Sequence, residues 1–389
     1  MSAPRRPVVI SGIGISRIGR RTGIPDIDLT AEAGREAITD AGLAPADIEG
    51  VATLGDTPIA DASAVLGIDP VNVGEDHTAG GLLSPFMSAG HAVAEGRVRH
   101  VLVYRTVSML GGTMLGGGTP MVNPPALDAT VRVMGDLDQL MAAHAYSAAN
   151  WLALHCRRHM HLYGTTKEQL GWLAVNSRRN AALNPRAVYR DPMTLDDYLA
   201  ARPISTPFGL YDCDVPVDGS IAFVVSAADH APDCPSPPVR IEAMGAPGAT
   251  PGGWVDRPDY PKMASVDAAT DLWSQTSLTP ADVDVAELYD GFTFLTLAWL
   301  EALGLCGDGE SGPFVEGATR IALDGELPLN TYGGQLSAGR MHGYWLLHEA
   351  CVQLRGQGGD RQVATAPEVA VAAAGGGPIA GCLLLTTSR

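Results

Sequence analysis

Short apolar runs alternate with helical patterns along the first third of the chain. Residues 8–14 (VVISGIG), 51–54 and 100–104 (HVLVY) have the continuous apolar character of buried strands. Residues 29–41 place small side chains on one face of a predicted helix, and residues 87–95 are rich in alanine. Strands that alternate with helices in this way predict parallel sheets with helices on their faces.

The middle of the chain has a different pattern. Residues 142–182 follow helical periodicity over two segments, and Thr165 or Thr166 is a candidate N-cap of the second. Two arginine pairs, 157–158 and 178–179, lie in this region. They are interpreted either as a solvated face or as contacts for acidic nucleotide groups.

Glycine and proline mark the connections on either side of the helical region. Residues 109–119 contain a triple glycine but no following G-K-[ST], which excludes a P-loop and favours a flexible loop. A turn and strand pattern resumes at 217–226. Four prolines in 231–238 then indicate a boundary.

Two sequence echoes in the same order indicate an internal repeat. VVISGIG from Val8 is echoed by VRIEAMG from Val239, and LAPADIEGV from Leu43 by LTPADVDVA from Leu278, at offsets of 231 and 235 residues. We therefore predict duplicated β-α-β halves in a five-layered α-β-α-β-α fold. The predicted N-terminal half is 1–108 with 217–230, the insertion 109–216 and the C-terminal half 239–389.

Composition and net charge indicate the class of protein and exclude some kinds of partner. Of the 389 residues 46% are hydrophobic and 18% charged, as expected for a globular protein with a large core. The net charge of -17 argues against nucleic acid or an anionic membrane as the main partner. No apolar run reaches spanning length and the N-terminus lacks a signal-peptide pattern, so we expect no membrane insertion and a cytoplasmic location.

The cysteines do not predict a metal site. The chain has six, and none forms a C-x-x-C pair: Cys156, Cys213, Cys234, Cys306, Cys351 and Cys382. Buried free thiols are the favoured interpretation.

Reactive side chains cluster within residues 329–356. A turn at Gly333 and Gly334 leads to an apolar helical pattern at 344–354, and Arg340, His342 and Tyr344 lie at its start. Glycines let a backbone approach a ligand, and the first N–H groups of a helix can bind an anion or an oxyanion. A helix cap in a glycine-rich protein explains the pattern equally well, and this stretch alone leaves both interpretations open.

Other candidates lie elsewhere in the chain. Tyr289 follows an apolar strand pattern, at a strand end where sites of α/β proteins gather. The glycines at 375–377 (Gly375, Gly376 and Gly377) follow VAVAA and favour a close backbone approach to substrate. His77 is a candidate pocket residue, and His348 within the apolar helix is interpreted as a satisfied core histidine.

Four motifs together resemble one family. They are the PAD repeats, YDGFT at Tyr289, NTYGGQLSAGRMHG at Asn330 and AAGGGPIAG at Ala373. In these the chain resembles the thiolase superfamily over nearly its whole length, and within it the bacterial sterol-carrier-protein-type thiolases, or lipid-transfer proteins. The resemblance implies acyl-CoA thioesters as substrates, with coenzyme A as part of the substrate and no covalently bound cofactor.

The chain departs from the thiolase pattern at four catalytic positions. No cysteine lies between Glu75 and Gly96, Arg340 replaces the catalytic histidine, Ala373 replaces the second cysteine, and Tyr289 replaces an asparagine or histidine. The sequence therefore argues against acyl-cysteine chemistry.

The YDGF loop resembles that of cysteine-less aldolases which shorten steroid side chains held as CoA thioesters. The resemblance implies retro-aldol cleavage of a β-hydroxyacyl-CoA, with an OB-fold partner that carries a zinc ribbon. Tyr289 would transfer a proton, its pKa lowered by Arg340, and glycine N–H groups would form the oxyanion hole. Those aldolases carry a second tyrosine at the position of Arg340, and the nearby Tyr332 and Tyr344 are out of register with it.

Three hypotheses therefore remain from the sequence. The first is a carbon–carbon lyase, the second an acyltransferase with another nucleophile, and the third a non-catalytic lipid or acyl-CoA carrier or scaffold. In a purely structural alternative Tyr289 packs and Arg340 pairs with a carboxylate such as Glu349. We also expect a homodimer, in which the strand at 100–104 pairs as an edge across a twofold axis.

Overall fold

The computed structural model describes residues 6–54, 56–74, 81–108, 136–248 and 253–387. The loop predicted at 109–119 and the candidate His77 lie outside these residues. In the N-terminal half the elements are β1 (Val8–Ile15), α1 (Asp26–Asp40), β2 (Gly50–Thr53), α2 (Ile59–Leu66), β3 (Val71–Gly74), α3 (Ser84–Ala94), β4 (His100–Ser108) and β7 (Asp218–Ala227).

The C-terminal half follows a similar order, without a counterpart of β3 and with the additional helix α11. Its elements are β8 (Val239–Gly245), α9 (Ser265–Trp273), β9 (Val285–Leu288), α10 (Thr293–Ala302), α11 (Ser311–Val315), α12 (Tyr344–Leu354), β10 (Val369–Gly376) and β11 (Ile379–Thr387). Between the halves lie α5 (Leu137–Ala142), α6 (Ala148–Tyr163), α7 (Lys167–Ala182), α8 (Leu195–Leu199) and the small sheet of β5 (Pro203–Ser205) and β6 (Phe208–Gly209).

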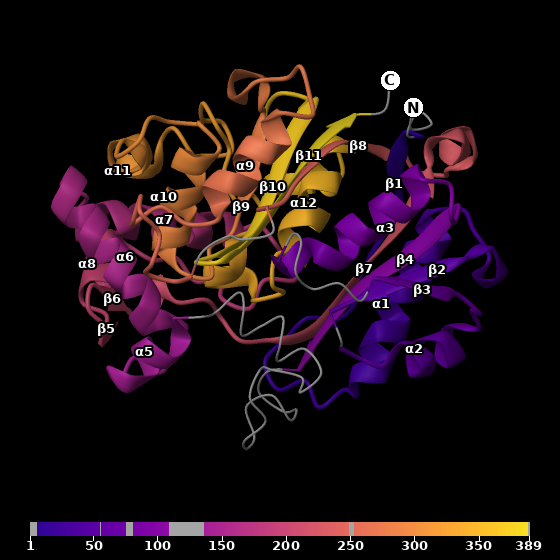
Figure 1. The fold of residues 1–389 in the computed structure, drawn as a ribbon, viewed down its shortest axis with the longest axis horizontal. Coiled ribbons are helices and arrows are strands. Elements are labelled where there is room, and N and C mark those ends of the chain that lie inside the picture. Colours follow the sequence, from indigo (N-terminus) through magenta and orange to yellow (C-terminus); the bar gives the residue numbers. More distant parts are fainter. Residues whose placement is uncertain (1–5, 55, 75–80, 109–135, 249–252, 388–389) are drawn as a thin grey trace.

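The two halves form one nine-stranded sheet with the order β3-β2-β4-β7-β1-β8-β11-β10-β9 (Figure 1). The first strands of the repeat, β1 and β8, meet at its centre as an antiparallel pair. Outward from this pair, β7-β4-β2 in one half matches β11-β10-β9 in the other. The predicted duplication is therefore confirmed.

The PAD motifs adopt the same local structure in both halves. Each forms a 3₁₀ turn immediately before a strand, at Pro45–Asp47 and at Pro280–Asp282. The aspartate carboxylate accepts the N–H of the residue three positions earlier, at 2.8 Å in both copies. This side-chain cap explains why the motif recurs where a helix segment ends and a strand begins.

The sheet is mixed, so the expectation of parallel sheets is wrong in that respect. β2 pairs in parallel with β3 and β4, and β9 with β10. β7 is antiparallel to β1 and β4, and β11 is antiparallel to β8 and β10. The closing strand of each half reverses because β11 follows β10 through a tight hairpin and β7 returns after a long excursion.

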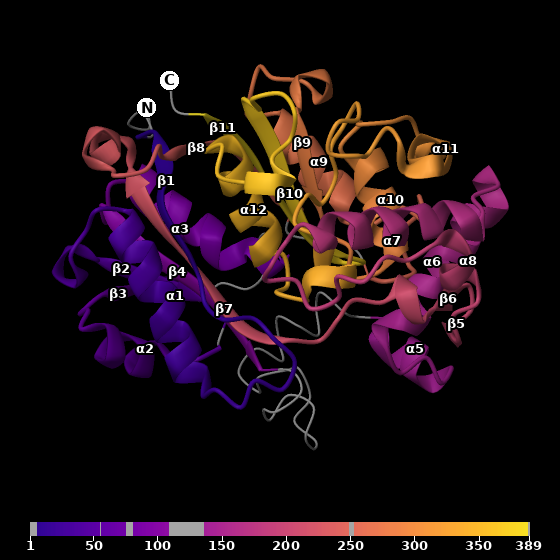
Figure 2. The same ribbon diagram turned by 180° about the vertical axis from the view of Figure 1, so that it is seen from behind.

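The predicted five layers are confirmed (Figure 2). Helices α1 and α2 cover one face of the N-terminal strands, α3 and α12 lie between the two sets of strands, and α9 and α10 cover the C-terminal strands. Alternate residues of β4 face the two sides: Leu102 and Tyr104 join the core under α1, whereas Val101 and Val103 join the central core.

Strand β4 is not an edge strand, which corrects the basis on which a homodimer was expected. It lies between β2 and β7, and its residues His100–Ser108 are paired along their length with β7. Within the described residues the edges of the large sheet are β3 and β9. Because β7 comes from beyond the intervening helices, the local pattern of HVLVY could not reveal this neighbour.

Helix α7 ties the helical region to the C-terminal half. Thr166 is its N-cap, and its hydroxyl accepts the N–H of Gln169 at 3.2 Å. Arg178 is buried and donates to Ser337 Oγ at 3.0 Å, and Arg179 donates to the carbonyl of Ala318 at 3.0 Å. This second arginine pair therefore cross-links the fold, whereas the pair at 157–158 is exposed.

Candidate functional site

The segment 327–354 carries two of the candidate site residues, Arg340 and His342. All of its residues are buried except Arg340 and His342. A π-helical turn, Gly334–Ala338, precedes them, and α12 begins after Gly343. Arg340 and His342 are thus the two side chains that this segment offers to a ligand.

The turn at Gly333 and Gly334 requires glycine, both for its backbone conformation and because a side chain would not fit. Gly333 and Gly334 have φ of 105° and 61°, values that favour glycine. A Cβ on Gly334 would lie 1.9 Å from the carboxylate of Asp290. Asp290 accepts the N–H groups of Gln335 at 2.8 Å and Leu336 at 3.3 Å, which fixes the turn against the loop after β9. The N–H groups of Gln335 and Leu336 are therefore already hydrogen-bonded to Asp290 and are not free donors for an oxyanion.

Arg340 pairs with Asp214, not with Glu349. Its Nη1 lies 3.2 Å from Asp214 Oδ1, with the two side chains 25% and 9% exposed. Its own N–H donates to the carbonyl of Val215 at 2.8 Å, so the chain entering β7 is fastened to the site. Arg340 thus pairs with a carboxylate, as the structural alternative expected, but the carboxylate is Asp214 and not the suggested Glu349.

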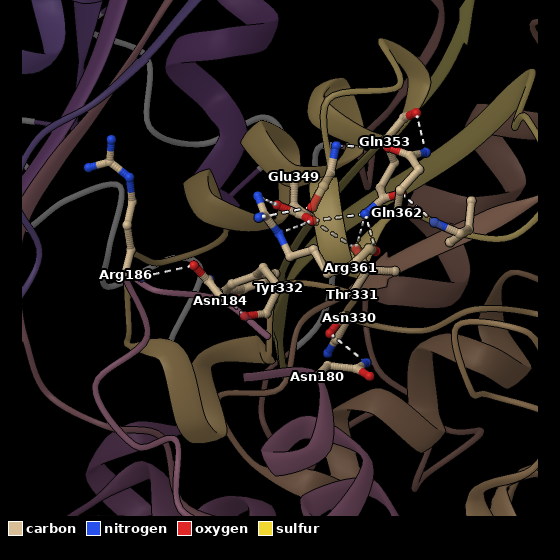
Figure 3. A network of polar contacts seen from close by, with 12 residues as sticks. Asn180, Asn184, Arg186, Asn330, Thr331, Tyr332, Glu349, Gln353, Arg361 and Gln362 are labelled. Carbon is tan, nitrogen blue, oxygen red and sulfur yellow. Dashed lines mark hydrogen bonds and ion pairs between the residues drawn. The ribbon is translucent and has the colours of Figure 1, made fainter. Parts of the chain in front are cut away.

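Glu349 belongs to a separate buried network (Figure 3). It is fully buried and accepts Arg361 Nε at 2.8 Å and Nη2 at 3.0 Å. The hydroxyl of Thr331 lies 2.7 Å from Glu287 and 3.0 Å from Glu349. Burial, and next the charge of Glu349, raise the pKa of Glu287. This network holds the start of the 329–356 segment to α12 and β9.

Tyr289 lies directly after β9, at the predicted strand end, and is 8% exposed. Burial raises the pKa of its hydroxyl, the charge of Asp214 raises it further, and Arg340 opposes both. The expectation that Arg340 leaves Tyr289 with a lowered pKa is therefore wrong, because burial and Asp214 outweigh it. Tyr289 keeps its proton at neutral pH and can act as a proton donor.

Two carboxyl groups near Tyr289 have perturbed pKa values, and sequence reasoning missed both as site residues. Burial raises the pKa of Asp214 to about 6, against the opposing charge of Arg340. Burial raises the pKa of Asp290 to about 7, although the N–H groups of Gln335 and Leu336 oppose it. The acidic run YDCDVPVD before β7 was the available signal for Asp214. Such groups near neutrality suit proton transfer.

His342 is held by a buried ion pair from the other half of the molecule. Its Nδ1 lies 2.5 Å from Arg105 Nη2, and Arg105 Nη1 lies 2.6 Å from Asp56. Burial, Arg105 and Arg340 lower the pKa of His342 well below its ordinary value. No pattern in the sequence indicates Arg105 as the partner of His342.

Tyr332 and Tyr344 pack in the core. Both are 0% exposed, and neither hydroxyl has a hydrogen-bond partner. The ring of Tyr332 stacks on Trp345 with centroids 5.0 Å apart, and the ring of Tyr344 lies 6.1 Å from Phe223. The structure brings neither hydroxyl into a hydrogen bond with Tyr289.

The triple glycine forms the end of β10 and its hairpin turn. The carbonyl of Gly375 accepts Trp299 Nε1 at 3.0 Å, and the carbonyl of Gly377 accepts the N–H of Ala264 at 2.9 Å. The preceding Ala374 contacts the site segment, since a Cβ on Gly343 would lie 2.4 Å from its Cβ. Gly343 therefore lets the site segment approach β10 closely, whereas Gly376 and Gly377 lie against the side chains of Leu295 and Trp254.

His348 lies in α12, outside the site. It is 7% exposed, and its Nδ1 has no hydrogen-bond partner, which corrects the prediction of a satisfied core histidine. It lines a groove of about 580 Å³ between α1, β1 and α12, together with residues that include Arg35 and Arg186. None of Tyr289, Arg340 and His342 lines this groove.

None of the six cysteines takes the position of the thiolase nucleophile at the start of α3. All six cysteines are free, three buried and three partly exposed, and none lies in α3. Ser84, at the start of α3, is buried with its hydroxyl unpartnered, so no base activates it. Among the described residues no group of three His, Cys, Asp or Glu side chains could hold a metal ion, and no helix could cross a membrane.

Comparison with known proteins places these features in context. Residues 251–385 match the family model described as thiolase C-terminal domain-like. The chain is 37% identical to the 17-hydroxy-3-oxo-4-pregnene-20-carboxyl-CoA lyase of Mycobacterium tuberculosis, over 96% of this chain and 98% of the relative. It is 32% identical to the steroid side-chain-cleaving aldolase of Thermomonospora curvata, over 99% of both chains.

Solved structures agree with these relatives. An Ltp2-ChsH2(DUF35) aldolase superposes with a TM-score of 0.86 at 30% identity, over 100% of both chains. A monomeric SCP2-thiolase-like protein type 1 from Mycobacterium smegmatis superposes with a TM-score of 0.69 over 100% of this chain and 79% of that one. At 20% identity, the second match speaks for the fold alone.

Proposed function

The chain belongs to the thiolase superfamily, and we propose that it cleaves a carbon–carbon bond of a β-hydroxyacyl-CoA thioester by a retro-aldol reaction. The observation that carries the proposal is the grouping of a protonated Tyr289 with the Asp214–Arg340 pair. It occurs in a chain without the thiolase cysteines, whose relatives include lyases and aldolases of steroid side chains. Steroid or lipid side chains held as CoA esters are the proposed substrate class.

The reaction requires one proton acceptor and one proton donor. Asp214, ionised above pH 6, accepts the proton of the β-hydroxyl group. The bond between the α and β carbons then breaks, the β carbon becomes a carbonyl, and the electron pair passes into the enolate of the thioester. Tyr289 protonates the α carbon, which yields the shortened acyl-CoA. A proton transfer from Asp214 to the Tyr289 phenolate restores the starting state.

Arg340 keeps Asp214 able to ionise, which the proposed acceptor role requires. A buried aspartate alone would hold its proton, and Arg340 opposes that effect by favouring the charged form. Its partly exposed guanidinium also offers hydrogen-bond donors to an anionic group of the substrate. Coenzyme A enters as part of the substrate, and no step needs a further cofactor.

The proposed assembly includes a second copy of this chain and an OB-fold partner with a zinc ribbon. Support for a partner comes from the similar solved structure, in which Ltp2 is described together with ChsH2(DUF35). Support for self-association is the edge strand β3, whose Val71 is 58% exposed. Light scattering of the chain alone and with the candidate partner tests both parts.

The test of the function is direct. The purified chain, alone and with the partner, is incubated with a β-hydroxyacyl-CoA of a steroid side chain, and products are identified by mass spectrometry. We expect a ketone and a shortened acyl-CoA, and no acyl adduct on the protein. An acyl adduct without cleavage would instead indicate the acyltransferase hypothesis.

A further inference from the structure

We propose that His342 is a neutral hydrogen-bond donor to the thioester carbonyl oxygen, acting through Nε2–H, and that Arg105 and Asp56 are its positioning residues. The inference rests on the proposed retro-aldol function and adds to it the group that stabilises the enolate. Four observations carry it, namely the contact with Arg105, the support of Arg105 by Asp56, the backbone geometry and the exposure of His342.

The contact with Arg105 determines the tautomer of His342. A guanidinium group has donors only and stays protonated in proteins. Since Arg105 Nη2 lies 2.5 Å from His342 Nδ1, that nitrogen must accept the hydrogen bond. A neutral imidazole then carries its single proton on Nε2. The imidazole is therefore oriented as a donor on the side away from Arg105.

Asp56 holds Arg105 in place for this task. The side chains of Arg105 and Asp56 are each 7% exposed, and Arg105 Nη1 lies 2.6 Å from Asp56 Oδ1. The second oxygen of Asp56 accepts the N–H of Thr106 and the hydroxyl of Thr53, both at 3.2 Å. These bonds tie the pair to β2 and β4, so the orientation of His342 is set by the N-terminal half while His342 belongs to the C-terminal half.

The position of His342 fits a role toward a ligand. With Arg340 it is one of two residues in 327–354 that are not buried. Its φ of 51° is uncommon for a residue other than glycine, and such strained conformations gather at functional sites. A purely structural histidine in this segment would need neither the strain nor the partial exposure.

A neutral donor suits the charge that develops in the reaction. As the carbon–carbon bond breaks, negative charge grows on the thioester oxygen, and a preorganised donor stabilises it without moving a proton. Burial and the two cationic groups around His342, Arg105 and Arg340, favour its neutral form. The nearby carboxylate of Asp56 is bonded to Arg105 through its Oδ1. Protonation of Nδ1 would also break the contact with Arg105.

The experiment combines kinetics with nitrogen NMR on the full chain, with its partner if the partner is needed. His342→Ala should lower kcat by roughly 10²–10³-fold, the usual effect of removing one oxyanion donor, and His342→Gln, which keeps an N–H donor, should recover part of it. The ¹⁵N spectrum of histidine-labelled protein should show His342 as a neutral Nε2–H tautomer at neutral pH. Arg105→Gln should lower kcat and broaden or shift this signal, whereas His161→Ala on the exposed end of α6 should change neither.

Specific results would overturn the proposal. An Nδ1–H tautomer, a protonated His342 at neutral pH, or wild-type kcat in a folded His342→Ala protein would each do so while the proposed function stands. The NMR measurement needs no variant, so a variant that fails to fold leaves the tautomer decidable. A wild-type complex that cleaves no thioester would overturn the donor role and the proposed function together.

Discussion

The carboxylate of Asp214 lies 3.2 Å from the guanidinium of Arg340, and yet its pKa is raised to about 6. An aspartate beside an arginine ordinarily has a lowered pKa, so burial must dominate here. The same carboxylate raises the pKa of the neighbouring Tyr289 hydroxyl. Burial therefore dominates at both proton-transfer groups, and the ion pair adjusts them: Asp214 is an acceptor that is ionised at neutral pH, and Tyr289 is a donor that keeps its proton.

Tyr289→Phe should lower turnover by roughly 10²–10⁴-fold, the range for loss of general acid–base catalysis. Only the hydroxyl is removed and the ring stays in place, so the melting temperature should change little. Tyr163→Phe is the matched control, because Tyr163 is 42% exposed at the end of α6 and should tolerate the change. Wild-type turnover in a folded Tyr289→Phe protein would remove Tyr289 from the reaction.

Asp214 should govern the acidic limb of the pH profile. Turnover should rise with pH as the carboxyl ionises, with an apparent pKa of about 6. Asp214→Asn should lower turnover and abolish this limb. A limb that persists unchanged in Asp214→Asn would assign it to another group, with Asp290 next in order because its pKa is raised to about 7.

The same shift has a consequence for stability. A carboxyl group whose pKa rises on folding binds more protons in the folded state than in the unfolded state between its two pKa values. Its contribution to stability is therefore present at low pH and is lost as pH rises from 3.8 to about 6. The difference in melting temperature between Asp214→Asn and wild type should grow over that interval in favour of the variant. A constant difference would contradict the raised pKa.

Arg340 variants should act through Asp214. Arg340→Gln removes the charge that opposes burial, so the acidic limb should move to higher pH. Arg340→Lys keeps the charge and loses the planar fork, so an acidic limb at the wild-type pH with lower turnover would indicate bidentate anchoring.

Arg340→His restores the thiolase residue but should not create thiolysis, because Ala373 and the cysteine-free stretch 75–96 leave no acyl carrier. Thiolysis by that variant would contradict the account.

The sequence patterns predicted much of the architecture and the position of one site residue. The PAD repeats and alternating strands led to the duplicated halves, and the strand-end position of Tyr289 was correct. Contacts between distant segments could not be predicted. Arg340 pairs with Asp214, which precedes β7, and His342 contacts Arg105 of the other half. The partners lie far apart in the sequence, so no local sequence pattern indicates either pair. The pKa of Tyr289 also depends on burial, which only the packed molecule defines.

The buried network around Glu349 should matter for stability and not for chemistry. Arg361→Met leaves the fully buried Glu349 carboxylate without its paired cation and should lower the free energy of unfolding by about 3–5 kcal/mol. Denaturant unfolding measures this loss, and kcat of the protein that remains folded should be near wild type. Arg320→Met is the control, because its pair with Glu326 is exposed and should contribute about 1 kcal/mol or less. Equal losses in the two variants would contradict a structural role for the Glu349 network.

The central claim is that cleavage proceeds through an enolate that receives a proton at the α carbon. The most direct measurement is cleavage of a β-hydroxyacyl-CoA in D₂O, with both products and the intact protein analysed by mass spectrometry. Cleavage through an enolate should give a shortened acyl-CoA with one deuterium at the α carbon, a ketone formed in equal amount, and a protein of unchanged mass. An acyl-CoA product without deuterium, or a covalent acyl adduct on the chain, would contradict it.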